Sequence, residues 1–385
     1  MSDRGATFFD SLFRTHDYFI LGESHGSSQI SRLTKALIPI YARHGGNLFG
    51  LEIGPYASHI LNTGLGRGPA EDLLWQLNAD YGIHTDSRPF YPIPFFSSAL
   101  DAEFLQAAHD HGLTTVGMDQ ENLFSYLLLI DSLIASVPDR DTDNKRLARA
   151  IRDTVNTHIQ QEIITRNEGT NQRAILPVTF RESAFIQEAL PRLAGVNPRT
   201  QRIVQSLTTS NAIYYHHATG DWWNSNRLRT ENFVANFRSV FLPDGEVSDE
   251  RLFLKIGGLH AAKGMNDYYR YDIGNVIFEF ARLTGRRSLH TIILNRHMVE
   301  EDGTVSDLLQ DTSSWYASNL AQLLAVGKPD QWTVIDLAKI RKQGLYFKDA
   351  HDTVRKYFER YDVFIIPPAD REPDPLVLPD GQQLH

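Results

Sequence analysis

The feature that most constrains the fold is a series of seven short apolar runs found at both ends of the chain. Each is rich in Ile, Val, Leu or Phe, a composition typical of strands buried on both faces. The runs are residues 18–23, 48–53, 114–119, 252–257, 289–294, 332–337 and 362–367. Helical patterns flank nearly all of them, and a strand, helix, strand order favours parallel pairing. The sequence therefore predicts an α/β fold with a mostly parallel central sheet flanked by helices.

The middle of the chain has a different pattern. Residues 122–248 contain amphipathic helical stretches and no convincing strand. Since strands return after them, we predict one α/β core domain made of residues 1–121 and 249–370, with residues 122–248 as a large helical insertion. Residues 371–385 are rich in Pro and Asp and are predicted to form a disordered tail.

Charge and residue usage exclude several classes of function. The net charge of −9 at pH 7 does not favour nucleic acid or an anionic membrane as a partner. The absence of cysteine excludes disulfides, thiolate metal sites and a cysteine nucleophile. No secretory signal and no apolar stretch of membrane-spanning length is evident. We therefore expect a cytoplasmic protein that binds neither nucleic acid nor membranes.

Polar residues stand where several of the apolar runs end. Five of them lie at or just after such an end, with glycines nearby: Glu23, His25, Glu52, Asp119 and His260. Ligands bind outside the carboxyl ends of parallel strands, so we expect these side chains to converge at one edge of the sheet. An acid at a strand end is often only the N-cap of the next helix, which is the competing interpretation of Asp119.

The two glutamates and two histidines would support two kinds of chemistry. Glu23, His25, Glu52 and His260 could together hold a divalent metal, Zn or Mn, with one position left open. The same residues would also suit a metal-free site in which a histidine takes a proton from water. The residue types leave both chemistries open.

A serine nucleophile is a rival mechanism, because residues 22–26 fit the pattern GxSxG between a strand and a helix. An α/β-hydrolase has several strands and an oxyanion loop before its nucleophile, whereas only one predicted strand precedes Ser24. Glu23 and His25 also project to one side of an extended strand and Ser24 to the other. Both observations argue against Ser24.

Four short motifs carry a family resemblance: LGESHG before a helix, GLE on the second strand, VGMD on the third, and KIGGLHAAKG late in the chain. With them the chain resembles the superfamily of erythromycin esterase-like, ChaN-like and Tiki-type proteins, over the α/β core. The resemblance implies a hydrolase in which Glu23 and His25 activate water and Glu52 is the acid of the second strand. The segment RTENFVAN resembles the esterase branch's arginine-to-asparagine helix, which implies that Arg229 and Asn236 bind substrate or organise the site.

Two departures from the esterase branch limit what the resemblance implies. One residue, instead of two, separates Glu23 from His25, as in the Tiki-type and ChaN-like branches. The late segment has only His260 where the esterase branch has two histidines three residues apart, and Gly257 stands at the first position. Macrolide ester hydrolysis is therefore not carried over as the specific activity.

The leading hypothesis is hydrolysis of an ester, lactone or amide in a small-molecule or peptide substrate, by water activated at the two glutamates and two histidines. Asp119, Arg229 and Asn236 would bind and orient the substrate. The alternative from another class is a non-catalytic protein that binds haem or a metal in the same cleft. A catalytically silent interaction domain is a third hypothesis. The substrate and the oligomeric state are not readable from the sequence.

Overall fold

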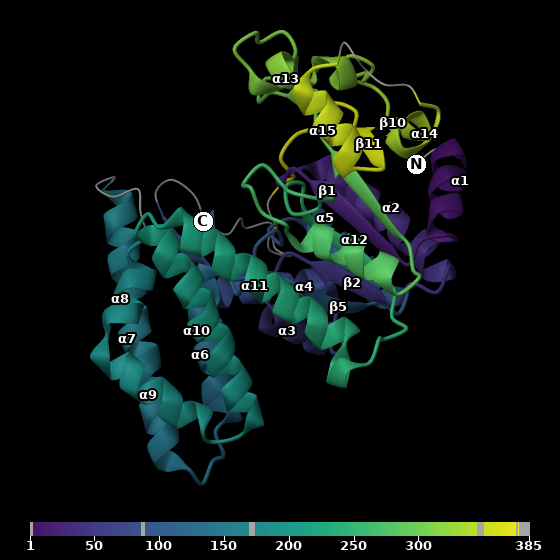
Figure 1. The fold of residues 1–385 in the computed structure, drawn as a ribbon. Helices are drawn as coiled ribbons and strands as arrows, with labels where there is room; N and C mark the ends of the chain where they lie inside the picture. The colour runs from purple at the N-terminus through teal and green to yellow at the C-terminus, as the bar shows by residue number, and fades with distance from the viewer. Residues whose placement is uncertain (1–2, 86–88, 169–173, 345–349, 375, 377–385) are drawn as a thin grey trace. The chain divides into compact units, whose positions relative to one another are not determined.

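The computed structural model in Figure 1 describes residues 3–85, 89–168, 174–344, 350–374 and 376. Contacts divide the chain into two compact units. The first comprises Met1–Glu52, Ser98–Thr115 and Val240–Asp374, and the second comprises Ile53–Ser97, Val116–Ser239 and Pro375–His385. Residues 53–97, which the sequence placed in the core domain, thus group with the helical segment. Of the predicted disordered tail, residues 375 and 377–385 lie outside the described residues.

A seven-stranded sheet has the strand order β10-β11-β7-β1-β6-β2-β5, and all of it except the last two residues of β5 belongs to the first unit. The seven strands coincide with the seven predicted runs: β1 (Tyr18–Glu23), β2 (Leu48–Leu51), β5 (Thr114–Gly117), β6 (Leu252–Gly257), β7 (Ser288–Ile293), β10 (Thr333–Asp336) and β11 (Val363–Ile366). The pairs β1·β6, β1·β7, β2·β6 and β7·β11 are parallel, and β10 is antiparallel to β11. The predicted α/β fold with a mostly parallel sheet is confirmed.

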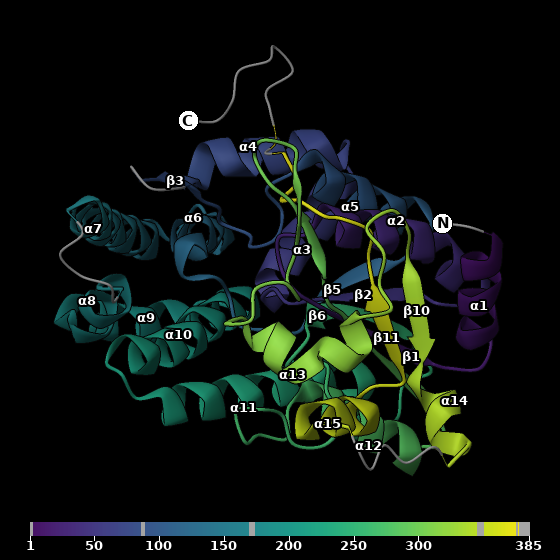
Figure 2. The same ribbon diagram turned by 90° about the horizontal axis from the view of Figure 1, so that it is seen from above.

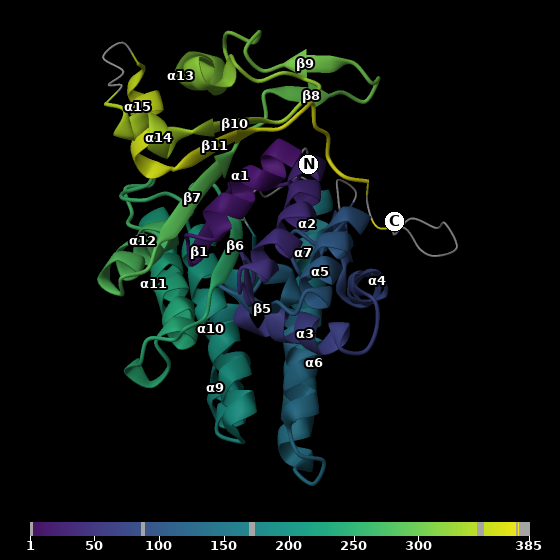
Figure 3. The ribbon, with the colours of Figure 1, turned by 90° about the vertical axis from the view of Figure 1, so that its right-hand side faces the viewer.

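Alternation along β1 determines which helices cover each face of the sheet. Phe19 packs against Phe13 of α1 (Asp3–Phe13), with 4.8 Å between the ring centroids. Its neighbour Tyr18 packs against Phe280 of α12 (Ile273–Leu283), at 6.2 Å. Because successive side chains of a strand point to opposite faces, α1 and α12 cover opposite faces. Figure 3 shows α2 (Ser28–Arg43) and α5 (Ala99–Asp110) on the same side as α1.

The rest of the first unit follows β7 in the chain. An antiparallel ribbon comes first, formed by β8 (His297–Val299) and β9 (Val305–Asp307). Three helices then complete the unit: α13 (Trp315–Leu324), α14 (Leu337–Lys342) and α15 (Asp352–Arg360). A 3₁₀ turn at Pro243–Gly245 precedes β6.

The second unit is helical. Its helices are α3 (Pro55–Leu65), α4 (Ala70–Tyr81), α6 (Tyr126–Ser136), α7 (Thr142–Asn167), α8 (Leu176–Glu182), α9 (Ala184–Ala194), α10 (Pro198–Ala218) and most of α11 (Trp222–Phe241). A 3₁₀ turn (Leu123–Ser125) and a short ribbon of β3 (Ile83–His84) with β4 (Pro89–Phe90) complete it. Figure 2 shows α6 to α10 gathered side by side. No helix in the described part of the chain is long and apolar enough to cross a membrane.

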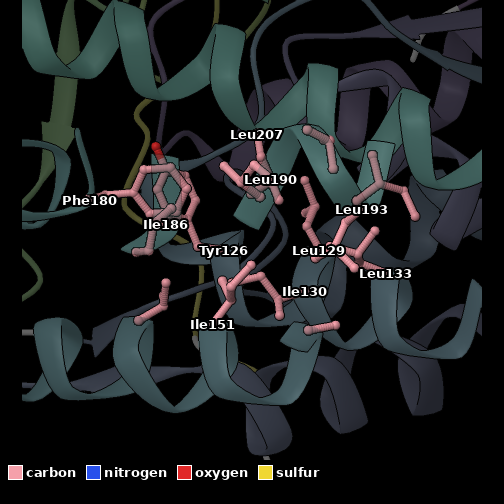
Figure 4. Close-up of a cluster of buried hydrophobic side chains, with 14 of the residues drawn as sticks. Tyr126, Leu129, Ile130, Leu133, Ile151, Phe180, Ile186, Leu190, Leu193 and Leu207 are labelled. Carbon is pink, nitrogen blue, oxygen red and sulfur yellow. The ribbon is translucent and has the colours of Figure 1, made fainter. Parts of the chain in front are cut away.

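An apolar core holds the helices of the second unit together. Figure 4 shows side chains from α6, α7, α9 and α10 meeting in this core. Leu129, Leu133, Ile151, Leu193 and Leu207 are among them, each 0% exposed. Since protein interiors are packed as densely as organic crystals, neighbouring side chains relax only partly into a gap left by a smaller residue.

We predict that Leu133→Ala lowers the free energy of unfolding by about 2–5 kcal/mol, because the substitution leaves a cavity in this core. Urea unfolding followed by circular dichroism measures the change. The matched control is Ile164→Ala, on α7 at 48% exposure, which should change the free energy by less than about 0.5 kcal/mol. Equal losses in the two variants would contradict the assigned core.

Candidate active site

Four predicted site residues lie together at one edge of the sheet in the first unit. Glu23 ends β1, Glu52 follows β2, and His260 follows β6. Because β1 and β2 both pair in parallel with β6, the carboxyl ends of the three strands meet. His25 comes two residues after β1, in the loop before α2. The fold thus brings Glu23, His25, Glu52 and His260 together, while their catalytic roles stay predictions.

His25 lies between two carboxylates. Its Nδ1 is 3.0 Å from Oε1 of Glu23, and its Nε2 is 3.5 Å from Oε2 of Glu52. The side chain of His25 is 38% exposed, whereas those of Glu23 and Glu52 are 4% and 6% exposed. His25 is therefore the member of the group that a ligand can reach from solvent, and the carboxylates hold its ring from the protein side.

Lys255, which was not predicted as a site residue, neutralises Glu23. Its Nζ donates a hydrogen bond to Oε1 of Glu23 at 2.7 Å. The register pairs Leu21 with Lys255, so Lys255 and Glu23 project from the same face of the sheet. Burial raises the pKa of Glu23, but the Lys255 ammonium and the hydrogen bond with His25 outweigh it, so the pKa lies below its ordinary value of 4.5. Glu23 is therefore ionised at neutral pH.

A second carboxylate and imidazole pair borders Glu52. The Nδ1 of His260 is 2.7 Å from Oδ2 of Asp272, and its Nε2 is 3.7 Å from Oε1 of Glu52. Asp272 also accepts the backbone N–H of Ile273 at 2.7 Å and is the N-cap of α12. A carboxylate that is hydrogen-bonded to one ring nitrogen fixes the orientation of the imidazole ring. Asp272 therefore determines that Nε2 of His260 points toward Glu52. In the sequence, Asp272 had only the signature of a helix cap.

The backbone of Gly257 completes the binding of Glu52. Its N–H donates to Oε2 of Glu52 at 2.6 Å. A Cβ added to Gly257 would lie 3.0 Å from Nε2 of His25 and 3.2 Å from Oε2 of Glu52. Both side chains would have to shift to make room for it. Gly257 occupies the position at which the esterase branch has a histidine. In this chain, the absence of a side chain there lets His25 and Glu52 lie close to the backbone of Gly257.

A buried carboxylate far along the chain fixes the loop that follows His25. Asp370 is 1% exposed and accepts hydrogen bonds from the hydroxyls of Ser27 and Ser28, the latter at 2.9 Å. The side-chain amide of Asn295 donates to it as well, at 2.9 Å. These contacts attach the start of α2 to the segment after β11. No local pattern in the sequence could have indicated a pairing over this separation.

Asp119, Arg229 and Asn236 form a cluster of their own within the second unit. The Nε of Arg229 donates to Oδ1 of Asp119 at 3.0 Å, and a second N–H of Arg229 donates to Oδ2. The side-chain amide of Asn236 donates to the carbonyl oxygens of Met118 at 3.1 Å and Asp119 at 2.9 Å. The contacts tie the loop after β5 to α11. The roles predicted for these three residues in substrate binding stay predictions.

The site as arranged does not fit a metal ion. Within the described ranges, no group of three or more His, Cys, Asp or Glu side chains is placed to hold one. The imidazole nitrogens face carboxylate oxygens, and Oε1 of Glu23 has the ammonium of Lys255 at 2.7 Å. Glu23, His25, Glu52 and His260 would have to shift before they could ligate Zn or Mn.

Ser24 lacks the partners of a catalytic serine. It is exposed, and its hydroxyl forms no hydrogen bond with any residue that the structure describes. Both ring nitrogens of the adjacent His25 face carboxylates. A serine nucleophile needs an imidazole within hydrogen-bond distance to take its proton. The geometry therefore gives Ser24 no base.

Solved structures share this fold. A mutant of the erythromycin esterase EreC, in its open conformation, aligns with a TM-score of 0.57 at 13% identity, over 98% of this chain and 97% of that chain. A succinoglycan biosynthesis protein aligns with a TM-score of 0.56 at 13% identity, over 96% and 92%. A Bacillus cereus protein aligns with a TM-score of 0.50 at 12% identity, over 97% and 94%. The sequence matches no family model and no curated protein. The chain therefore has the erythromycin esterase-like fold that its motifs predicted.

Proposed function

We propose that the chain is a hydrolase in which His25 activates water for attack on an ester, lactone or amide. The observation that carries the proposal is the partly exposed imidazole of His25, held between the buried carboxylates of Glu23 and Glu52. A carboxylate-oriented imidazole is a common general base in hydrolases. The fold shared with an erythromycin esterase supports the assignment as a hydrolase but does not indicate a particular substrate.

Glu23 sets the protonation state of the base. Because Nδ1 of His25 lies 3.0 Å from Oε1 of Glu23, we assign the ring proton to Nδ1, which leaves Nε2 to accept a proton. The negative charge of Glu23 then stabilises the imidazolium that forms. Lys255 supports this role by keeping Glu23 ionised, through the contact that lowers its pKa.

The proton and electron movements follow from this assignment. Water attacks the carbonyl carbon of the substrate as its proton passes to Nε2 of His25, and negative charge develops on the carbonyl oxygen. When the tetrahedral intermediate collapses, the imidazolium returns the proton to the leaving alcohol or amine. Glu52, 3.5 Å from Nε2, can accept a hydrogen bond from a water bound beside the ring. The other carboxylate oxygen of Glu52, Oε1, lies 3.7 Å from Nε2 of His260.

For the proposed base, we predict that His25→Ala lowers turnover of ester substrates by about 10²- to 10⁴-fold, the contribution typical of a general base. The melting temperature should change little, since the side chain is 38% exposed. A panel of p-nitrophenyl esters, lactones and p-nitroanilides provides the assay. Ser24→Ala is the matched control in the same loop and should keep the activity of the wild type.

Four outcomes would count against this mechanism. Activity retained in His25→Ala, or lost in Ser24→Ala, would exclude His25 as the base. Loss of activity on treatment with a chelator, restored by Zn or Mn, would show that a metal is required. A wild type with no activity on any member of the panel, purified with stoichiometric metal or a haem chromophore, would favour the non-catalytic binding protein.

A further prediction concerns pH. The pKa of Glu23 is lowered, so its contribution to stability is present above the ordinary value of 4.5 and is lost as pH falls through the folded-state pKa. In Lys255→Met, burial acts without the ammonium, and the pKa of Glu23 should rise above that value. The variant should lose about 3–5 kcal/mol of unfolding free energy at pH 8. The loss should shrink as pH falls and Glu23 takes up a proton.

Urea unfolding of both proteins between pH 5 and pH 8 measures this loss. Lys35→Met is the matched control, because Lys35 pairs with Glu103 at 2.9 Å but both side chains are about half exposed. That variant should lose less than about 1 kcal/mol at every pH. A loss in Lys255→Met that does not vary with pH would contradict the assigned role of Lys255.

A further inference from the structure

A cavity of about 710 Å³ lies at the other edge of the central sheet, within the first unit. Its walls include His16, just before β1, Ser288, the first residue of β7, and Val363, the first residue of β11. These positions are the amino ends of parallel strands, whereas Glu23 stands at the carboxyl end of β1. The cavity is therefore distinct from the candidate active site, with the length of β1 between them.

The lining of this cavity is basic although the chain as a whole is acidic. Six lining residues are cations at neutral pH: Arg282, Arg286, Arg287, Lys339, Arg341 and Lys342. Against these six, the lining contains two carboxylates, Asp336 and Asp362. Two of the six cations also pair with carboxylates outside the lining, Arg282 with Glu279 at 3.3 Å and Arg286 with Asp249 at 3.0 Å. The lining still contains more cations than carboxylates, in a chain whose net charge is −9. A concentration of positive charge in a concave site attracts anions.

Two of the cations are fixed by the protein. Arg341 pairs with Asp362 at 2.6 Å, and Arg286 donates to the hydroxyl of Tyr18 at 2.9 Å. Both side chains are half-buried. Their guanidinium groups are therefore held in place before any ligand arrives, which reduces the entropy lost on binding.

Three other cations of the lining have no anionic partner among the described residues. Arg287, Lys339 and Lys342 have exposed side chains and form no ion pair with any described residue. Three like charges around one cavity repel one another until an anion binds among them.

We propose that this cavity binds a small molecule that carries phosphate groups. Guanidinium and ammonium groups together are the usual phosphate ligands, and a multiply charged anion would balance the charges of Arg287, Lys339 and Lys342. The volume lies in the range of small-molecule sites, whereas nucleic acids bind along extended basic surfaces. Leu12, Phe278 and Leu289 also line the cavity and would contact the organic part of the ligand.

The test is isothermal titration calorimetry of the full chain with inorganic pyrophosphate at low ionic strength. We expect saturable binding of one pyrophosphate per chain, weakened by added salt. Arg287→Glu combined with Lys342→Glu should raise the dissociation constant at least about tenfold, since two attractive charges become repulsive. The matched control combines Arg32→Glu with Lys356→Glu, both exposed and outside the cavity, and should leave the constant within about twofold.

Two results would overturn the proposal. The first is the absence of saturable binding by the wild type at low salt. The second is equal weakening in the two double variants, which would show a response to net charge instead of a site. Neither variant alters Glu23 or His25, so the outcome is independent of whether the chain is a hydrolase. A melting-temperature measurement on each variant confirms that it is folded before titration.

Discussion

The candidate active site depends on one buried ion pair, between Lys255 of β6 and Glu23 of β1. A carboxylate buried beside apolar strands is costly unless a partner compensates for its lost hydration. Lys255 provides that partner from the neighbouring strand at 2.7 Å. If Glu23 were protonated, it would lose the negative charge that attracts the Lys255 ammonium and the proton on Nδ1 of His25. The ion pair thus controls how the exposed imidazole is oriented.

From this ion pair, carboxylates alternate with cationic or imidazole groups across three strand ends. The order is Lys255, Glu23, His25, Glu52, His260 and Asp272. Each member lies within 4 Å of the next, so the four inner side chains are each oriented from two directions, and most members are buried. A site whose dipoles are fixed in advance needs little reorganisation when charge develops in a transition state. A preorganised site of this kind is better suited to hydrolysis than a site in which the same residues are loosely held.

The sequence predicted the strands well, because runs buried on both faces need continuous apolar residues, and it predicted the residues at their ends. It could not predict that β10 runs antiparallel to β11, because an apolar run does not indicate in which direction the strand is oriented. Lys255 was missed because it stands inside such a run, and Asp272 because a helix cap has the same local signature. Asp370 pairs with Ser28 across 342 positions. Contacts between residues so far apart in the chain depend on the tertiary fold, and a local sequence pattern does not predict them.

The pairings of β1 have a consequence for how the protein is made. β1 is translated more than two hundred residues before both of its neighbours in the sheet, β6 and β7. The carboxylate of Asp370, which holds the loop after His25, is translated later still. While the intervening residues are being translated, the nascent chain contains His25 and Glu23 without the strands that bring them into place. The four site residues can therefore come together only after β6 and His260 have been translated.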